Sequence, residues 1–177
     1  TTVPSSFAGS VIGSSKILGV DLMENFRAPY FARSVPEFWR RWHISLSTWF
    51  KDYVYFPLGG SRSTRALRMR NMLIVFLISG LWHGASWNFV VWGALHGLFM
   101  AAATAGAGAW KKLGDALGLG EDSLPLALIQ GLSTFALVTL AWVFFRAATL
   151  SDSLNILAGM TRGWERGLDQ AALIQSP

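Results

Sequence analysis

The sequence predicts an all-α membrane protein, a polytopic bundle of transmembrane helices with one amphipathic helix at the membrane interface. The chain is 52% hydrophobic and 14% charged, whereas a soluble domain carries roughly 25% charged residues. Residues 71–110 contain no Asp, Glu, Lys or Arg, and a second uncharged run covers 123–145. Nine tryptophans suit a chain that places amphipathic rings where the membrane meets water.

Residues 34–56 are predicted to form the amphipathic helix. Ser34 and Glu37 have the spacing of a capping box, in which the serine accepts a backbone N–H and the glutamate reaches back to the cap. Since basic and hydroxyl side chains fall away from the apolar stripe, we expect this helix to lie at the interface and not to cross the bilayer. The stripe recurs at steps of three and four residues and consists of Phe38, Trp42, Leu46, Trp49 and Tyr53.

The uncharged run 71–110 is predicted to make two crossings. As a helix it would be about 60 Å long, and one hydrocarbon core needs roughly 20 residues, so we expect a break near 84–88 or at Gly93. Arginines precede the run and Lys111 and Lys112 follow it, so the positive-inside rule predicts that both ends are cytoplasmic. A further crossing is expected at 123–146.

The chain has no cysteine, so thiol nucleophiles and thiolate metal sites are excluded. The side chains considered for chemistry are its three histidines. An ionisable residue within a span is by default a functional candidate. The alternative is a neutral imidazole that only packs and hydrogen-bonds across helices, and we favour this for His96. Metal binding is not expected, since no HxxxH pair occurs and no carboxylate joins the histidines in the uncharged run.

The surroundings of His83 favour general-base chemistry. Ser79, His83 and Trp87 are four residues apart and would share one face of a helix. Gly80 and Gly84 flank the histidine, so a backbone or a slender substrate could approach it closely. A neutral imidazole in a dry passage can take a proton from a hydroxyl or a thiol, which fits acyl transfer.

Two long motifs in this order resemble those of the membrane-bound O-acyltransferase family. They are FWRRWHISLSTWFKDYVYFPLGGSR at 38–62 and GLWHGASWNFVVWG at 80–93. The shorter stretches ENFRAPYFARS and WVFFRA are similar to the bacterial branch that serves alginate O-acetylation and teichoic-acid D-alanylation. Residues 1–177 are accordingly expected to be part of a single such domain, as a C-terminal-half fragment of a longer protein.

The resemblance implies a helical protein around a central tunnel that takes an acyl group from a cytoplasmic thioester donor. By motif position, His83 is expected to be the catalytic histidine and His43 the second polar residue of the site. For the arginines near His43, contact with lipid headgroups and helix packing remain alternatives to a role in the site. The candidate substrate-binding residues are Ser79, Trp82, Trp87, Arg40, Arg41 and Asp52.

We therefore expect a multi-pass O-acetyltransferase of the bacterial inner membrane that moves acetyl groups toward an exported polysaccharide such as alginate. Acetyl-CoA is the expected donor substrate, with no bound cofactor and no metal. The expected partners are an extracytoplasmic acetyltransferase, the exported polysaccharide and membrane lipid. Nucleic acid is not expected, because a basic, aromatic segment beside spans more often meets anionic headgroups.

Two other classes of function remain open at this stage. In a haem-binding electron-transport protein, His83 and His96 would be iron ligands, with matching histidines on another helix. In a passive transporter or scaffold segment, the histidines would only pack or relay protons. The sequence does not determine which polymer accepts the acyl group.

Overall fold

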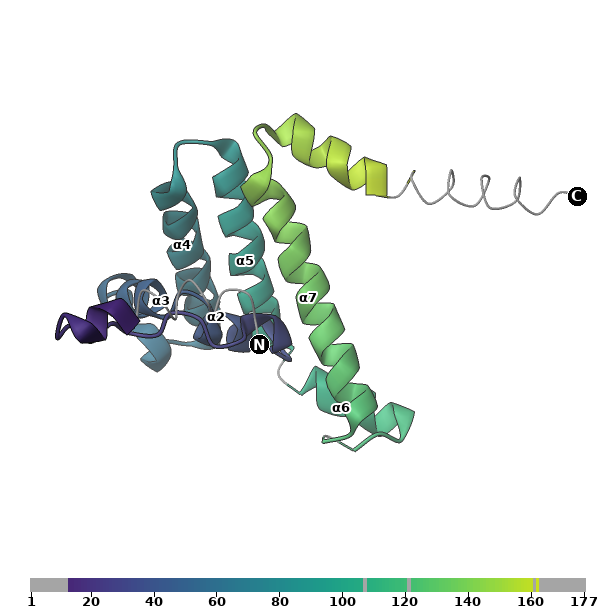
Figure 1. The fold of residues 1–177 in the computed structure, drawn as a ribbon. Coiled ribbons are helices and arrows are strands. Elements are labelled where there is room, and N and C mark those ends of the chain that lie inside the picture. The colour runs from purple at the N-terminus through teal and green to yellow at the C-terminus, as the bar shows by residue number, and fades with distance from the viewer. Residues whose placement is uncertain (1–12, 107, 121, 161, 163–177) are drawn as a thin grey trace, which may run out of the picture.

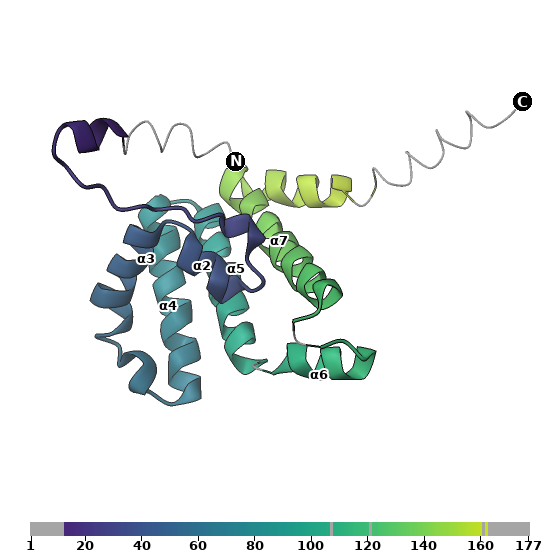
Figure 2. The same ribbon diagram turned by 60° about the horizontal axis from the view of Figure 1, so that its bottom comes forward.

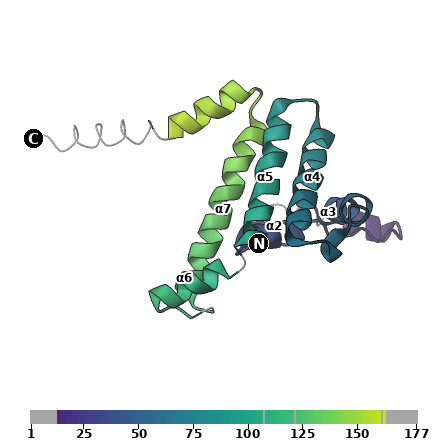
Figure 3. The ribbon, with the colours of Figure 1, turned by 180° about the vertical axis from the view of Figure 1, so that it is seen from behind.

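Three long helices stand side by side and form one layer of the molecule (Figure 1). They follow the order α4 (Arg65–His83), α5 (Trp87–Ala105) and α7 (Leu124–Arg146), and the view from behind in Figure 3 shows the same order. The structure is a computed structural model and describes residues 13–106, 108–120, 122–160 and 162. Every regular element in these residues is helical, so the predicted all-α class is confirmed.

The shorter helices lie on one face of the layer and at its ends. Helix α2 lies over one face, α3 lies beside α4 at the edge of the layer, and α6 lies across the end where α5 finishes and α7 begins (Figure 2). A further helical segment at 150–160 leads away from the opposite end (Figure 1). The short elements are η1 (Pro29–Phe31), α2 (Val35–Arg41), α3 (Ile44–Phe50), the π-helical turn η2 (Lys51–Tyr55), η3 (Gly60–Arg62) and α6 (Ala109–Leu117).

Helices α5 and α7 are long and apolar enough to cross a bilayer. Helix α4 is not among the described helices that meet this condition, because its first turns carry Arg65, Arg68 and Arg70. The run 71–110 does divide into two helices with a break at 84–86, within the region where the break was expected. That α4 crosses the membrane remains a prediction.

The hairpin of α4 and α5 is held together by close backbone contact. A Cβ added to Gly80 would lie 2.2 Å from the carbonyl oxygen of Phe89, and one added to Gly93 would lie 2.3 Å from that of Phe76. At the far end of the hairpin, the Arg65 guanidinium donates to the last carbonyl groups of α5. Small residues let the two backbones meet, and the arginine satisfies carbonyls that the helix end leaves without partners.

The prediction of one continuous amphipathic helix over 34–56 is wrong. Helix α2 ends at Arg41, Trp42 is extended and His43 has a φ of 44°, so the chain turns before α3 begins. The predicted stripe is therefore split between two helices and a π-helical turn, and its members no longer share one face. Phe38 is buried, whereas Trp49 and Tyr53 are 49% and 68% exposed.

The predicted capping box is half right. The Ser34 hydroxyl oxygen accepts the backbone N–H of Glu37 at 3.3 Å, as expected of an N-cap. The Glu37 carboxylate accepts the backbone N–H of Arg33 at 2.8 Å instead of that of Ser34. Its other oxygen binds the Arg41 guanidinium at 2.5 Å, so Glu37 joins the cap to the last turn of α2.

Candidate functional site

His83 is the last residue of α4, where an aromatic cage surrounds its ring. The chain leaves the helix through Gly84, whose φ of 149° lies in a region that only glycine adopts readily. The imidazole meets the ring of Phe145 edge-on at 4.9 Å between centroids and that of Trp92 at 5.3 Å. Phe89 adds a third ring at 6.0 Å. The rings of the cage come from α5 and α7, and the histidine comes from α4. All three long helices therefore contribute to the site.

His43 lies at the turn between α2 and α3 in a left-handed backbone conformation, with a φ of 44° and a ψ of 56°. This conformation costs a non-glycine residue on the order of 1–2 kcal/mol, and such strain persists only where neighbouring contacts enforce it. Asn25 supplies these contacts. Its backbone carbonyl accepts the N–H of Ile44 at 3.1 Å, and its side-chain oxygen accepts the backbone N–H and the hydroxyl of Ser45 at 3.0 and 2.6 Å.

The fold brings the two candidate histidines toward each other although forty residues separate them. The Nδ1 atom of His43 is buried without a hydrogen-bond partner among the described residues. An aromatic path joins the two regions, from Trp42 to Trp142 at 5.2 Å, then to Phe145 at 5.2 Å and to His83.

His96 lies apart from this pair, inside the aromatic core. It is completely buried, and its Nδ1 accepts the indole N–H of Trp39 at 3.2 Å. The rings of Trp92, Trp39 and Phe76 lie 5.0, 5.0 and 5.9 Å away. This environment agrees with the packing interpretation and leaves no room for a haem against the ring in this arrangement.

The predicted helical face holds for Ser79 and His83, which lie four residues apart on α4, but not for Trp87. Since α4 ends at His83 and α5 begins at Trp87, the two ends of this spacing belong to different helices. Trp87 is 73% exposed and Trp82 is 61% exposed. The Trp82 ring lies 5.0 Å from that of His83, so of the two tryptophans it is Trp82 that adjoins the imidazole. Ser79 is buried.

The three charged candidates have different environments. Arg41 is engaged within the protein, because it binds Glu37 and donates to the carbonyl of Ala28 at 3.4 Å. Asp52 is exposed on the π-helical turn. Arg40 is exposed and lines a pocket that Ser79 also lines. Of these three residues, only Arg40 lines the pocket.

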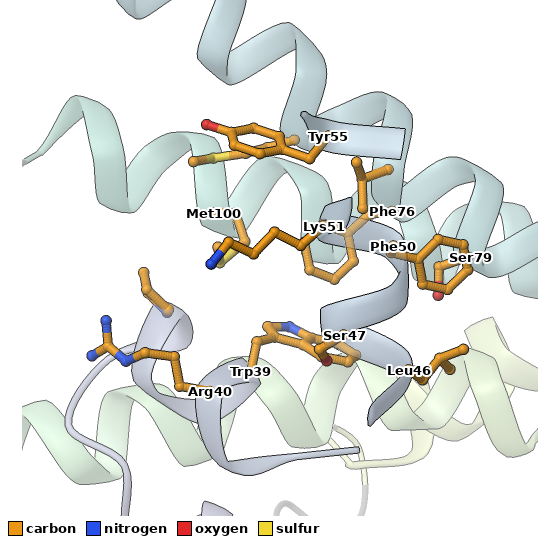
Figure 4. A pocket seen from close by; sticks show the side chains of 13 residues that line it. Trp39, Arg40, Leu46, Ser47, Phe50, Lys51, Tyr55, Phe76, Ser79 and Met100 are labelled. Atoms are coloured by element: carbon orange, nitrogen blue, oxygen red, sulfur yellow. The ribbon is translucent and has the colours of Figure 1, made fainter. Parts of the chain in front are cut away.

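The pocket lies between the short helices and the α4–α5 hairpin and has a volume of about 260 Å³. Figure 4 shows Trp39 and Arg40 on one wall and Lys51 and Tyr55 on another. Neither His43 nor His83 lines it. Within the described ranges, no three His, Asp or Glu side chains come together as a metal site would require.

Sequence reasoning missed the residues that build the cage around His83. Trp92 and Phe145 each contact the imidazole, yet neither was a candidate. Both lie within the stretches GLWHGASWNFVVWG and WVFFRA. Aromatic residues inside those motifs are therefore the signal that could have identified them.

Comparison with known proteins adds a family to this geometry. The family model of the membrane-bound O-acyltransferases matches residues 10–109. A peptidoglycan O-acetyltransferase of Helicobacter pylori is 41% identical over 156 residues, which are 88% of this chain and 28% of the relative. A probable alginate O-acetylase of Azotobacter vinelandii is 40% identical over 156 residues, 88% of this chain and 29% of the relative.

A teichoic acid D-alanyltransferase of Bacillus subtilis is more distant, at 31% identity over 96 residues, 50% of this chain and 24% of the relative. The chain spans less than a third of the length of these curated relatives. The matched residues 10–109 include His43, His83 and the whole α4–α5 hairpin.

Proposed function

Because the chain belongs to the membrane-bound O-acyltransferase family, we propose that it serves the transfer of acetyl groups to an exported cell-surface polysaccharide. The observation that carries the proposal is the aromatic cage around His83, which a path of ring contacts joins to Trp42, the neighbour of His43. The donor is a cytoplasmic acyl thioester, acetyl-CoA. The acceptor is the hydroxyl of a polysaccharide such as alginate, or of an extracytoplasmic acetyltransferase that passes the group on.

His83 acts as the general base in this reaction. Its imidazole takes the proton of the attacking hydroxyl while the oxygen bonds to the thioester carbon. The carbon–sulfur bond then breaks, and the departing thiolate receives that proton, so the imidazole is neutral again at the end. The rings of Phe89, Trp92 and Phe145 exclude water, which would otherwise hydrolyse the thioester.

His43 orients or polarises the thioester. Its position is fixed by the hydrogen bonds from the following residues to Asn25, and its Nδ1 has no partner within the described residues. A group held this rigidly can meet the reacting carbonyl at little cost in entropy. Direct transfer is the simpler route, because a covalent acyl-enzyme in a chain without cysteine would need a Ser, Thr or His nucleophile.

The proposed location is the bacterial inner membrane, which the protein crosses several times. The apolar helices α5 and α7 support crossings, and Arg65 at the start of the arginine-rich first turns of α4 donates to carbonyl groups at the end of α5. By the positive-inside rule this end faces the cytoplasm, where the donor is made. Membrane lipid is a further proposed partner.

Replacing the two histidines in the full-length protein tests the proposal. His83→Ala should lower acetylation of the exported polymer about 10²- to 10⁴-fold, the usual cost of losing a general base, and His43→Ala should also lower it severely. The measurement is the acetyl content of the polymer from cells that lack their own copy of the protein. Membrane abundance is measured in the same cells.

Asp115→Asn, an exposed change on α6, is the matched control and should leave acetylation unchanged. Near-normal acetylation by a well-expressed His83→Ala protein would refute the catalytic assignment. Loss of acetylation in His96→Ala alone would instead place the reacting group in the aromatic core.

A further inference from the structure

The pocket between the short helices and the α4–α5 hairpin combines an apolar interior with cationic groups. Arg40 and Lys51 contribute the charges, and no lining residue within the described ranges is acidic. In Figure 4 the charged ends of these two side chains and the Tyr55 hydroxyl lie on the same side of the pocket. The apolar lining includes Trp39, Leu46, Phe50, Met72, Val75 and Phe76.

The two cations are not neutralised within the part of the chain that the structure describes. The Arg40 guanidinium makes no hydrogen bond or ion pair there, although that of its neighbour Arg41 binds Glu37. The Lys51 ammonium lies 5.3 Å from the centroid of the Phe56 ring, a cation–π contact that leaves its charge in place. The pocket therefore complements a negative charge attached to an apolar body.

The acyl donor is a poor match for this pocket. Neither His43 nor His83 lines it, so a thioester held wholly within it would not meet either imidazole. The indole of Trp39 is one wall and is hydrogen-bonded to the buried His96, which closes the pocket on that side. A free phosphate would leave the apolar lining without a partner, whereas an acyl chain would cover it.

We propose that this pocket binds an anionic phospholipid, with one acyl chain against the apolar lining and the headgroup between Arg40 and Lys51. The basic, amphipathic elements α2, α3 and η2 form its outer wall, and such segments meet the headgroup region of a bilayer. The bound lipid fills the space between these elements and the α4–α5 hairpin. It holds the turn that carries His43 against the helix that carries His83.

Binding is measured on the full-length protein reconstituted in phosphatidylcholine bilayers. Spin-labelled phosphatidylglycerol and spin-labelled phosphatidylcholine are compared by the fraction that the protein immobilises. Arg40→Gln with Lys51→Gln should lower the preference for phosphatidylglycerol on the order of fivefold for each charge removed. The matched control, Arg33→Gln with Arg62→Gln, removes two exposed charges of the same segment that do not line the pocket and should keep most of the preference.

A second pair of variants tests the apolar part. Val75→Trp fills the pocket and should abolish the preference, whereas Ile78→Trp, on the exposed side of the same helix, should retain it. An unchanged preference in the Arg40/Lys51 variant, or an equal loss in the Arg33/Arg62 control, would overturn the proposal. Displacement of the lipid by coenzyme A would also overturn it, because the pocket would then belong to the thioester donor.

Discussion

The hydrogen bond from Trp39 to His96 connects two residues that are 57 positions apart. An indole nitrogen can only donate, so Nδ1 of His96 is an acceptor and the imidazole is neutral in this arrangement. Its Nε2 is buried without a partner among the described residues. Since Trp39 also lines the pocket, His96 positions the wall between that pocket and the aromatic core.

Truncating His96 should therefore destabilise the protein. His96→Ala leaves the partly buried indole N–H of Trp39 without an acceptor, which costs about 1–3 kcal/mol, in addition to the cavity left by the ring. His96→Gln restores an acceptor and should recover part of the loss. The measurement is thermal stability of the purified protein in detergent.

The Trp39→Phe background supplies the control for this hydrogen bond. There the donor is absent, so His96→Ala should cost less than it does in the wild-type protein, and the difference measures the coupling. Equal costs in both backgrounds would show that the hydrogen bond contributes nothing. Acetylation should survive His96→Ala to the extent that the protein folds.

Because the backbone of His43 is left-handed, two substitutions at this position should differ in stability although both remove the imidazole. Glycine adopts a φ of 44° freely, whereas alanine carries a Cβ penalty of about 1–2 kcal/mol there. His43→Gly should thus be more stable than His43→Ala, while both lose acetyl transfer. If the alanine variant were as stable as the glycine variant, the turn would relax without the histidine.

At the scale of elements, the α4–α5 hairpin depends on how closely two helices approach. Gly80 and Gly93 each face a carbonyl oxygen of the opposite helix, so a single methyl group cannot be added without moving a backbone. The hairpin sets the position of His83 relative to Trp92. A change in the helix separation would therefore alter the cage as well as the stability.

Gly93→Ala should destabilise the hairpin by about 1–3 kcal/mol, the usual cost of overpacking. Gly131→Ala is the matched control, because a Cβ at this glycine of α7 meets nothing within 4 Å and alanine is the better helix former. The two variants should change thermal stability in opposite directions. A neutral Gly93→Ala would mean that α4 and α5 pack more loosely than the structure shows.

On the scale of the whole molecule, the three long helices define two ends. Arg65 donates to the carbonyl groups of Thr104 and Ala105, so the start of α4 and the end of α5 share one end. The side chain of Asn88 donates to the carbonyl oxygen of Ala147 at 2.7 Å, so the start of α5 and the end of α7 share the other. If the end that holds Arg65 is cytoplasmic, the end that holds Asn88 and Ala147 faces the opposite side of the membrane.

Labelling of single cysteines tests that orientation in a chain that has none of its own. Cysteines at Arg62 and Lys112 should resist an impermeant thiol reagent in intact cells and react after permeabilisation. A cysteine at Ala85, in the exposed turn between α4 and α5, should react in intact cells. Equal labelling of Lys112 and Ala85 would rule out this hairpin topology.

Local patterns in the sequence determined the elements of this protein. The uncharged runs identified α5 and α7, the glycines near His83 marked the break between α4 and α5, and Ser34 marked the start of α2. These features depend on residues a few positions apart. The charge pattern of a window and the conformational freedom of a glycine can be evaluated without knowing what packs against them.

Only the tertiary structure decided which side chains meet. The turn at His43 interrupts a strong helical pattern because Asn25, eighteen residues earlier, accepts hydrogen bonds from Ile44 and Ser45, and no local signal at His43 indicates this. The cage of His83 requires α4, α5 and α7 to pack together, and the bond from Trp39 to His96 requires α2 to dock against α5. Docking depends on the shape and packing of whole helix faces, which residue spacing along one helix does not specify.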